Sequence, residues 1–442
     1  MWRYYIALAV RNSSRSKALT ALVVVLMSFG VASCMVCYAV FRVTTGDPIP
    51  ARSARLYVPQ VDNFGPTKNS NGEPPDLLSY RDATTLWQAH WASRQTLVYP
   101  AKWGVESNNP LVPPLLLAGD AVTADFFGMF GAPFQFGAGW SAADDAQHAT
   151  VVVISPALNQ RLFAGKNSVG ITIRVDGHAL RITGVLGRWN PKPRFFDVAS
   201  SGRHSAFDDA GQIYVPLTLA VDLKKASPTW YCSANDINPD VASWNSFLHS
   251  ECAWISAWVE LPTAADAKQY AGLLRNYASE QQRAGRFAWS PNIRLRNLID
   301  WLAFERVVPE SSTLSMAVSS SFLVIALVNV IGLMLARFMR RAAEIGIRRA
   351  LGASRRAIYR QFLTEAATIG LAGGLLATAL TSLGLWSLGW LFEPGIAYLV
   401  HVDASLVVWT VLLAIGATLV SSLYPTWRAA RVQPAWQIKI NG

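Results

Sequence analysis

Long apolar runs divide this chain of 442 residues into membrane-like and soluble segments. Residues 18–41, 313–336 and 404–425 contain no charged side chain, and residues 362–392 contain only Glu365, near their start. A helix needs about 20 apolar residues to cross the hydrocarbon core of a bilayer. The pattern predicts four transmembrane helices, at residues 18–41, 313–339, 362–392 and 404–425.

The segment between the first two apolar runs, residues 42–312, has the mixed pattern of a folded soluble domain. Its apolar stretches predict strands at residues 55–59, 95–99, 114–118, 151–155, 171–175, 180–186, 212–216, 253–261 and 292–298. Apolar residues at helical spacing predict helices at residues 77–90, 156–163 and 264–280. Asp176-Gly177 lies between two predicted strands and is a strong signal for a hairpin turn.

The order of these elements predicts a mixed α/β domain with a second part inserted in it. The α/β part is expected at residues 43–120 and 251–309, and the inserted β-rich part at residues 121–220. Residues 224–250 show no clear period. A segment of this length is large enough for two such parts.

The net charge of +11 becomes informative once its position along the chain is considered. Acidic and basic residues nearly balance in the long middle segment, so the excess of Lys and Arg lies beside the apolar runs. Short basic segments stay on the cytoplasmic side of a membrane. Membrane topology therefore explains the basic excess, and we do not expect this protein to bind nucleic acid. The predicted cytoplasmic segments are residues 1–17, 340–361 and 426–442, and the predicted outer segments are residues 42–312 and 393–403.

The first apolar run also has features of a signal sequence. Basic residues precede it, and Val31-Ala32-Ser33-Cys34 resembles a lipoprotein cleavage site. The run continues past Cys34 to Phe41, which makes it long enough to span a membrane. We therefore expect an uncleaved membrane anchor.

Residues that carry catalysis or bind metals form no recognisable constellation. The histidines are scattered without an H-x-x-x-H or H-E-x-x-H pair, and no G-x-S-x-G motif occurs. We therefore expect neither a metal site nor a catalytic centre. Cys232 and Cys252 lie in the predicted outer segment, where a disulfide would close a loop of about 20 residues. Two free thiols are the alternative, and Cys34 and Cys37 are expected to be packing residues of the first helix.

The stretch RRAAEIGIRRALGASRRAIYRQF, residues 340–362, places seven arginines and one acid between two apolar runs. Apolar residues at helical spacing predict a helix that Gly352 ends, and Ser354 is expected to cap a second helix. Positive-inside charge and binding to anionic lipid would explain the arginines. They do not explain the ordered apolar pattern.

Two pairs of small residues allow close approach of neighbouring helices. These pairs are Gly332-x-x-x-Ala336 and Gly370-x-x-x-Gly374. The pattern leaves open whether they pack within one subunit or between two subunits.

Several motifs resemble one protein family. Residues 344–366, EIGIRRALGASRRAIYRQFLTEA, resemble the cytoplasmic segment of FtsX-like permeases of ABC transporters, and residues 424–438, YPTWRAARVQPAWQI, resemble their C-terminal end. Residues 121–140, 151–186 and 213–219 resemble the periplasmic core domain of MacB-like permeases. The matches follow the order of the family along most of the chain.

The resemblance implies a multi-pass permease subunit of the inner membrane, with one helix, a large periplasmic domain and three more helices. It implies a homodimer or heterodimer of permeases, a partner ABC ATPase and, for an exporter, a periplasmic adaptor protein. Members of the family transmit motion from the ATPase to the periplasmic domain, and we expect that mechanism here for export of a periplasmic or membrane-derived cargo. The same architecture would also serve signalling, regulation of a cell-wall hydrolase, or lipoprotein release.

The chain contains no G-x-x-x-x-G-K-[ST] motif, whose glycines and lysine would hold nucleotide phosphates. We therefore expect no ATP hydrolysis and no directly bound cofactor, with ATP used by a separate subunit. The resemblance implies that the basic segment couples the permease to that ATPase. Glu344 and Arg348 would offer charged contacts there. The candidate coupling residues are Glu344, Ile345, Gly346, Ile347, Arg348, Arg349, Leu351 and Gly352.

Overall fold

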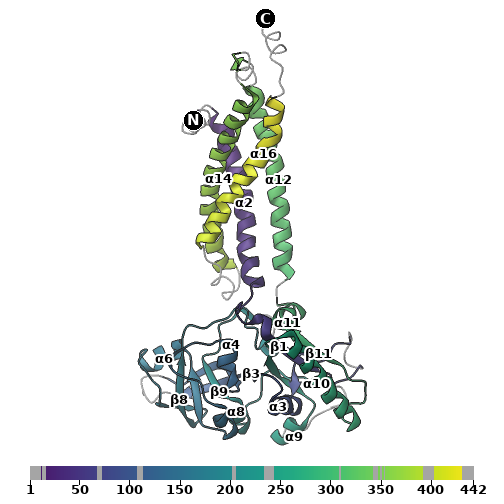
Figure 1. Ribbon diagram of the computed structural model, residues 1–442. Coiled ribbons are helices and arrows are strands. Elements are labelled where there is room, and N and C mark those ends of the chain that lie inside the picture. Colours follow the sequence, from purple (N-terminus) through teal and green to yellow (C-terminus); the bar gives the residue numbers. More distant parts are fainter. Residues whose placement is uncertain are drawn as a thin grey trace. The chain divides into compact units, whose positions relative to one another are not determined.

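The computed structural model divides the chain into two compact units (Figure 1). One unit contains Met1–Thr45 and Pro309–Gly442 and carries the long helices, and the other contains Gly46–Val308. The structure describes residues 11, 16–66, 72–106, 113–201, 206–232, 243–307, 310–341, 347–348, 351–352, 354–391 and 403–430.

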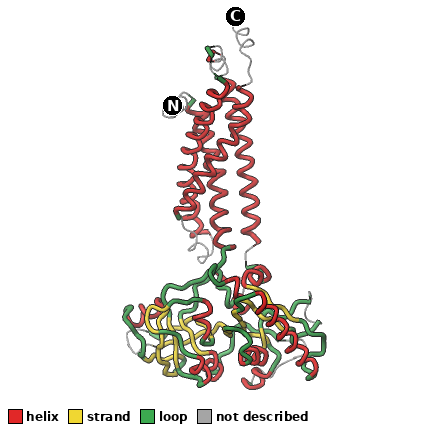
Figure 2. Tube along the Cα trace, in the orientation of Figure 1, coloured by secondary structure: helices red, strands yellow, loops and turns green. Residues whose placement is uncertain are grey.

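Among the described residues, four long helices form the first unit (Figure 2). They are α2 (Lys17–Thr45), α12 (Glu310–Arg340), α14 (Arg355–Leu391) and α16 (Ala404–Ala430). Each predicted span falls on one of them, and each helix is long and apolar enough to cross a membrane. Helix α14 packs along α16, and α2 contacts both α12 and α14. Large apolar side chains such as Phe29, Phe322 and Leu375 are exposed on the bundle, which is favourable in lipid rather than in water.

Glycines bring α14 close to α16. A Cβ atom added at Gly370 would lie 2.8 Å from the Cα of Ile415 on α16, and Gly374 faces the same helix. The structure therefore places this predicted pair in a contact within one subunit. The other predicted pair, Gly332 and Ala336, is exposed on α12, and a Cβ at Gly332 would meet no atom within 4 Å.

The second unit is built on one mixed sheet. Within the described residues, its strands follow the order β11-β1-β10-β3-β4-β9-β6-β8-β5, with β2 beside β10 and β7 beside β3 and β8. The strands are β1 (Leu56–Val61), β2 (Leu78–Ser79), β3 (Arg94–Glu106), β4 (Leu115–Val122), β5 (Phe134–Gly137), β6 (Val151–Ile154), β7 (Thr172–Val175), β8 (His178–Leu186), β9 (Ile213–Pro216), β10 (Ala253–Glu260) and β11 (Ile293–Asn297). The helices are η1 (Ser53–Arg55), α3 (Tyr80–Gln88), α4 (Asp125–Phe130), α5 (Ala142–Ala146), α6 (Pro156–Phe163), α7 (Val198–Ser201), α8 (Leu217–Asp222), α9 (Trp244–His249), α10 (Ala264–Arg283) and α11 (Leu298–Phe304).

The long strand β3 joins the two halves of this sheet. Gln95 near its start pairs with Val259 of β10, whereas Val105 near its end pairs with Leu115 of β4. Strand β4 then pairs in parallel with β9 and continues the sheet into the half that contains β6, β8 and β5. The sheet therefore does not break at residue 121, where the sequence analysis places the start of the inserted part.

The predicted hairpin over Asp176-Gly177 is formed by β7 and β8. These strands pair in antiparallel fashion beginning at Val175 and His178. Asp176 and Gly177 have φ angles of +49° and +81°, the left-handed values that the tightest hairpin turns require.

Cys232 and Cys252 form a disulfide, the pairing that the sequence analysis expects. The two cysteines are separated by 20 residues along the chain, of which residues 233–242 lie outside the described residues. The neighbouring residues Tyr231 and Ala253 form a β-bridge, so the bond fastens this segment to β10. In α2, Cys34 is buried and Cys37 is partly buried.

Asp120 of β4 is a buried carboxyl group without a hydrogen-bond partner among the described residues. Burial raises the pKa of Asp120 to about 7, and the charge of Asp197 adds to this shift while Arg194 opposes it. Tyr214 of β9 occupies the same register position as Asp120 in the parallel pair. Its hydroxyl is also buried and has no partner in the part of the chain that the structure describes.

Removal of the disulfide should destabilise the outer unit. The bond restricts the unfolded chain over its loop, so Cys232→Ala/Cys252→Ala should lower the free energy of unfolding by about 3 kcal/mol, which is several degrees in the melting temperature. Thermal unfolding of the full chain, followed by near-ultraviolet circular dichroism, measures this change. Cys34→Ala/Cys37→Ala is the control and should change the melting temperature less. A disulfide variant that melts like the unchanged protein would contradict the prediction.

The raised pKa of Asp120 predicts a pH-dependent stability. The group contributes stability that is full below its unfolded pKa of about 3.9 and is lost as the pH rises through about 7. At pH 8, Asp120→Asn should therefore raise the free energy of unfolding of the full chain by on the order of 1–3 kcal/mol, which raises its melting temperature. At pH 5 the increase should be smaller. The exposed Asp208→Asn is the matched control. An equal effect of Asp120→Asn at both pH values would show that its ionisation does not matter.

Candidate functional site

The end of the bundle where α12 finishes and α14 begins contains both buried and exposed charged groups. The candidate coupling segment lies in this connection. The structure describes four of its candidate residues, Ile347, Arg348, Leu351 and Gly352. The other four, Glu344, Ile345, Gly346 and Arg349, lie outside the described residues.

A buried ion cluster connects α12 to α14. The Nη2 atom of Arg337 on α12 lies 2.5 Å from Oε1 of Glu365 on α14. Arg341, four residues after Arg337, brings its Nη1 within 3.2 Å of Oε2 of the same carboxylate. The side chains of Arg337 and Glu365 are only 2% and 3% exposed, so the protein itself encloses this pair.

Such a pair is stable only while both partners are present. An isolated charge in a medium of low dielectric constant is disfavoured by several kcal/mol, and loss of one partner from a buried pair typically costs about 3–5 kcal/mol. An apolar contact joins the same two helices, since the rings of Phe338 and Phe362 lie 4.3 Å apart between centroids. The ion cluster and these rings together fix which turn of α12 faces which turn of α14.

The described part of the connection between the two helices contains a left-handed glycine and a helix cap. Gly352 has a φ angle of +95°, a conformation that residues with a side chain avoid. Ser354 accepts a hydrogen bond from the backbone N–H of Ala357 at 3.2 Å and so caps the start of α14. These features are the helix break and the cap that the sequence predicts. Arg348 donates a hydrogen bond to Oε1 of Gln361 at 2.9 Å, which ties the connection to α14.

Two large apolar side chains of the connection are exposed. Ile347 is 63% exposed and Leu351 is 82% exposed. The N–H of Leu351 donates to the carbonyl oxygen of Ile347 at 3.0 Å, so the two residues lie one helical turn apart. An exposed apolar pair beside arginines is chemically suited to bind the surface of another protein.

The sequence analysis singled out the exposed connection but did not assign the ion cluster beneath it. Glu365 carried a signal, because it is the only acid in its apolar run and an ionisable residue in a membrane helix usually has a specific partner. Its partners Arg337 and Arg341 are 28 and 24 residues away, which no local pattern specifies.

Comparison with known proteins identifies the family. The profile of the FtsX-like permease C-terminal family matches residues 316–434. The profile of the MacB-like periplasmic core domain matches residues 20–277, which is more than half of the chain. The chain belongs to the MacB/FtsX-like permeases of ABC transporters.

Relatives of this permease include proteins named for export. It is 25% identical over 248 residues to the macrolide export ATP-binding/permease protein MacB of Bdellovibrio bacteriovorus, over 55% of this chain and 32% of that protein. It is 25% identical over 428 residues to the pyoverdine export ATP-binding/permease protein PvdT of Pseudomonas fluorescens, over 94% of this chain and 56% of that protein. The permease thus spans from about a third to a little over half of the length of these relatives.

Among solved structures, the periplasmic region of MacB from Actinobacillus actinomycetemcomitans matches the permease with a TM-score of 0.36 and 13% identity, over 59% of this chain and 96% of that one. The family match and the helices agree on one architecture. Within the described residues, four apolar helices accompany a large mixed α/β unit, and the MacB-like core-domain profile covers most of that unit. This is the fold class that the sequence predicts.

Neutralising Glu365 should destabilise the helix unit of this permease. Glu365→Gln leaves two arginines facing a buried site without a counter-charge, so the free energy of unfolding should fall by about 3–5 kcal/mol. Thermal unfolding of the detergent-purified chain, followed by far-ultraviolet circular dichroism, measures the loss. Asp403→Asn is the control, because Asp403 pairs with Arg42 at an exposed site where solvent screens the charges, so its loss should matter far less. Equal effects of the two substitutions would mean that the buried pair contributes no more to the free energy of unfolding than the exposed pair does.

Proposed function

We propose that this permease is the membrane subunit of an ABC complex that exports a periplasmic or membrane-derived cargo. In this proposal a partner ATPase hydrolyses ATP in the cytoplasm, and the permease carries the resulting motion to its outer α/β unit. The observation that supports it best is the bundle end, where exposed Ile347 and Leu351 belong to a connection tied to α14 only one turn before Glu365. Export is favoured over a regulatory role because the relatives described above are named for export.

The charge distribution supports the orientation in this proposal. The basic segments at both ends of the chain and in the α12–α14 connection belong on the cytoplasmic side. The α/β unit then belongs in the periplasm and the helices in the inner membrane. An oxidising periplasm is also the compartment in which the Cys232–Cys252 disulfide would persist.

The order of elements along the chain supports a mechanical role. The α/β unit is inserted between α2 and α12, so its two ends continue into two different helices. A shift of α12 relative to α2 therefore changes the separation of those ends. Because Arg337 and Glu365 hold α12 to α14, a force applied at the connection moves both helices together.

ATP hydrolysis in the proposed complex comes from another ATP-binding domain. The 442 residues contain no phosphate-binding G-x-x-x-x-G-K-[ST] motif. We propose a separate ATPase subunit that binds at Ile347 and Leu351, with the arginines of the connection adding charged contacts. The chain itself would bind no cofactor and carry out no chemical step.

Two permeases would assemble along α12. The apolar part of this helix is 28% buried within its own unit, the lowest share among the described membrane helices. Gly332 and Ala336 are exposed on it, and small residues allow a second helix to approach closely. The second subunit would be a copy of this chain or a related permease. A periplasmic adaptor protein would complete the export path.

Charge placed on the exposed apolar pair should uncouple the ATPase. Ile347→Asp/Leu351→Asp would prevent burial of two apolar side chains, so association with the ATPase should weaken more than about tenfold and its stimulated ATP turnover should fall to the basal rate. Co-purification and ATP turnover with the ATPase encoded beside the permease measure both effects.

The matched control is Leu116→Asp, because Leu116 is an exposed leucine on β4, 73% exposed, in the α/β unit. It should leave ATPase binding and turnover unchanged. If the double variant binds and stimulates the ATPase normally while the control behaves as expected, the proposed docking site is wrong.

A further inference from the structure

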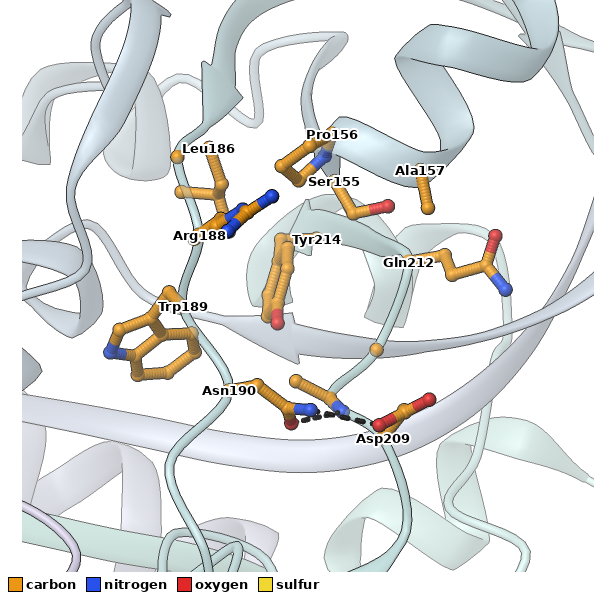
Figure 3. A pocket seen from close by; sticks show the side chains of 13 residues that line it. Ser155, Pro156, Ala157, Leu186, Arg188, Trp189, Asn190, Asp209, Gln212 and Tyr214 are labelled. Atoms are coloured by element: carbon orange, nitrogen blue, oxygen red, sulfur yellow. Dashed lines mark hydrogen bonds between the residues drawn. The ribbon is translucent and has the colours of Figure 1, made fainter. Parts of the chain in front are cut away.

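The α/β unit contains a pocket that the proposed transport function does not use. Its volume is about 470 Å³, which is within the usual range for small-molecule sites. Figure 3 shows that its walls come from the start of α6, from the chain that follows β8, and from β9. The lining residues belong to the start of α6, to β9 and to the irregular segments that follow β8 and precede β9.

One side of the pocket is rich in hydrogen-bond donors. Arg188 lines it and makes no ion pair or hydrogen bond with another residue that the structure describes. Ser155 accepts a hydrogen bond from the N–H of Leu158, which leaves its own hydroxyl proton available. The pocket also reaches Ala157, whose N–H lies in the first turn of α6, where no acceptor exists inside the helix. Together these groups favour an anion.

Aromatic rings form another part of the pocket. Trp189 stacks on Phe196 with an interplanar angle of 13° and a centroid separation of 5.6 Å. Trp189 is only partly buried and lines the pocket, so the other face of its indole is available to a ligand. A flat aromatic surface of this kind favours a flat ligand that stacks on it.

The acidic residue of the pocket does not oppose an anion strongly. Asp209 accepts a hydrogen bond from Nδ2 of Asn190 at 2.8 Å and lies 3.4 Å from Nζ of Lys192. Its charge is therefore already paired. Asp120 lies behind Gly211, where an added Cβ would come within 2.7 Å of its Oδ2, and does not line the pocket.

We propose that this pocket binds an organic anion with a flat aromatic body. The anionic group lies between Arg188, the Ser155 hydroxyl and the first turn of α6. The ring of the ligand packs against the indole of Trp189. The site is independent of ATPase docking, and its test requires only binding.

The test uses the full chain in lipid nanodiscs and three probes with the same indole body. Indole-3-acetate is an anion, indole-3-acetamide is neutral, and tryptamine is a cation. Saturation-transfer NMR titrations give the Kd of each probe, with empty nanodiscs as the blank. We expect indole-3-acetate to bind at least about tenfold more tightly than the other two, because its carboxylate gains charge-assisted hydrogen bonds. Decanoate, an anion with a flexible aliphatic body, should compete poorly.

One substitution tests the charge. Arg188→Gln should raise the Kd for indole-3-acetate about tenfold. Arg181→Gln, at an exposed arginine of β8 outside the pocket, should leave the Kd unchanged.

Three results would overturn the proposal. They are the absence of saturable binding by indole-3-acetate, equal binding of the three indole probes, and a Kd that Arg188→Gln does not change. Decanoate that competes as well as indole-3-acetate would overturn the aromatic part of the assignment. Because Arg188 is exposed, Arg188→Gln should fold normally, and an unchanged melting temperature checks this.

Discussion

The buried contact between Arg337 and Glu365 joins the end of α12 to the start of α14. Charges of this kind are stable in a medium of low dielectric constant only as a pair, so these two helix ends have to lie side by side. Along the rest of their lengths α12 packs on α2 and α16, and α14 packs on α16 at Gly370, where no side chain would fit. An apolar residue at position 365 would leave Arg337 buried without its counter-charge, so the end of α12 would have to move.

The same end of the bundle has charged side chains on the inside and apolar side chains on the outside. Arg337 and Arg341 face inward and share the carboxylate of Glu365, whereas the connection that follows presents Ile347 and Leu351 to the outside. Inward charges fix the helices, and outward apolar groups remain available for a partner. A docking surface next to a rigid helix pair transmits force better than one on an isolated loop, because little of the motion is absorbed by local bending.

The sequence predicted the features that depend on short-range chemistry. The Asp176-Gly177 hairpin, the break at Gly352 and the four apolar helices follow from turn residues and from run length. Strand β3 was predicted only in part, because Pro100 interrupts its pattern and its pairing with β4 and β10 is decided by distant residues. The partners of Glu365 were missed for the same reason. The roles of all the candidate coupling residues remain predictions, and half of these residues lie outside the described residues.

Local rules of stability are broken at two places, and each has a functional interpretation. Glu365 puts a charge in an apolar helix, and Leu351 exposes a large apolar side chain. A sequence selected for stability alone would avoid both, since each is disfavoured on its own. Glu365 is compensated within the chain by two arginines. Leu351 has no such compensation among the described residues, so its natural complement is the surface of a bound protein.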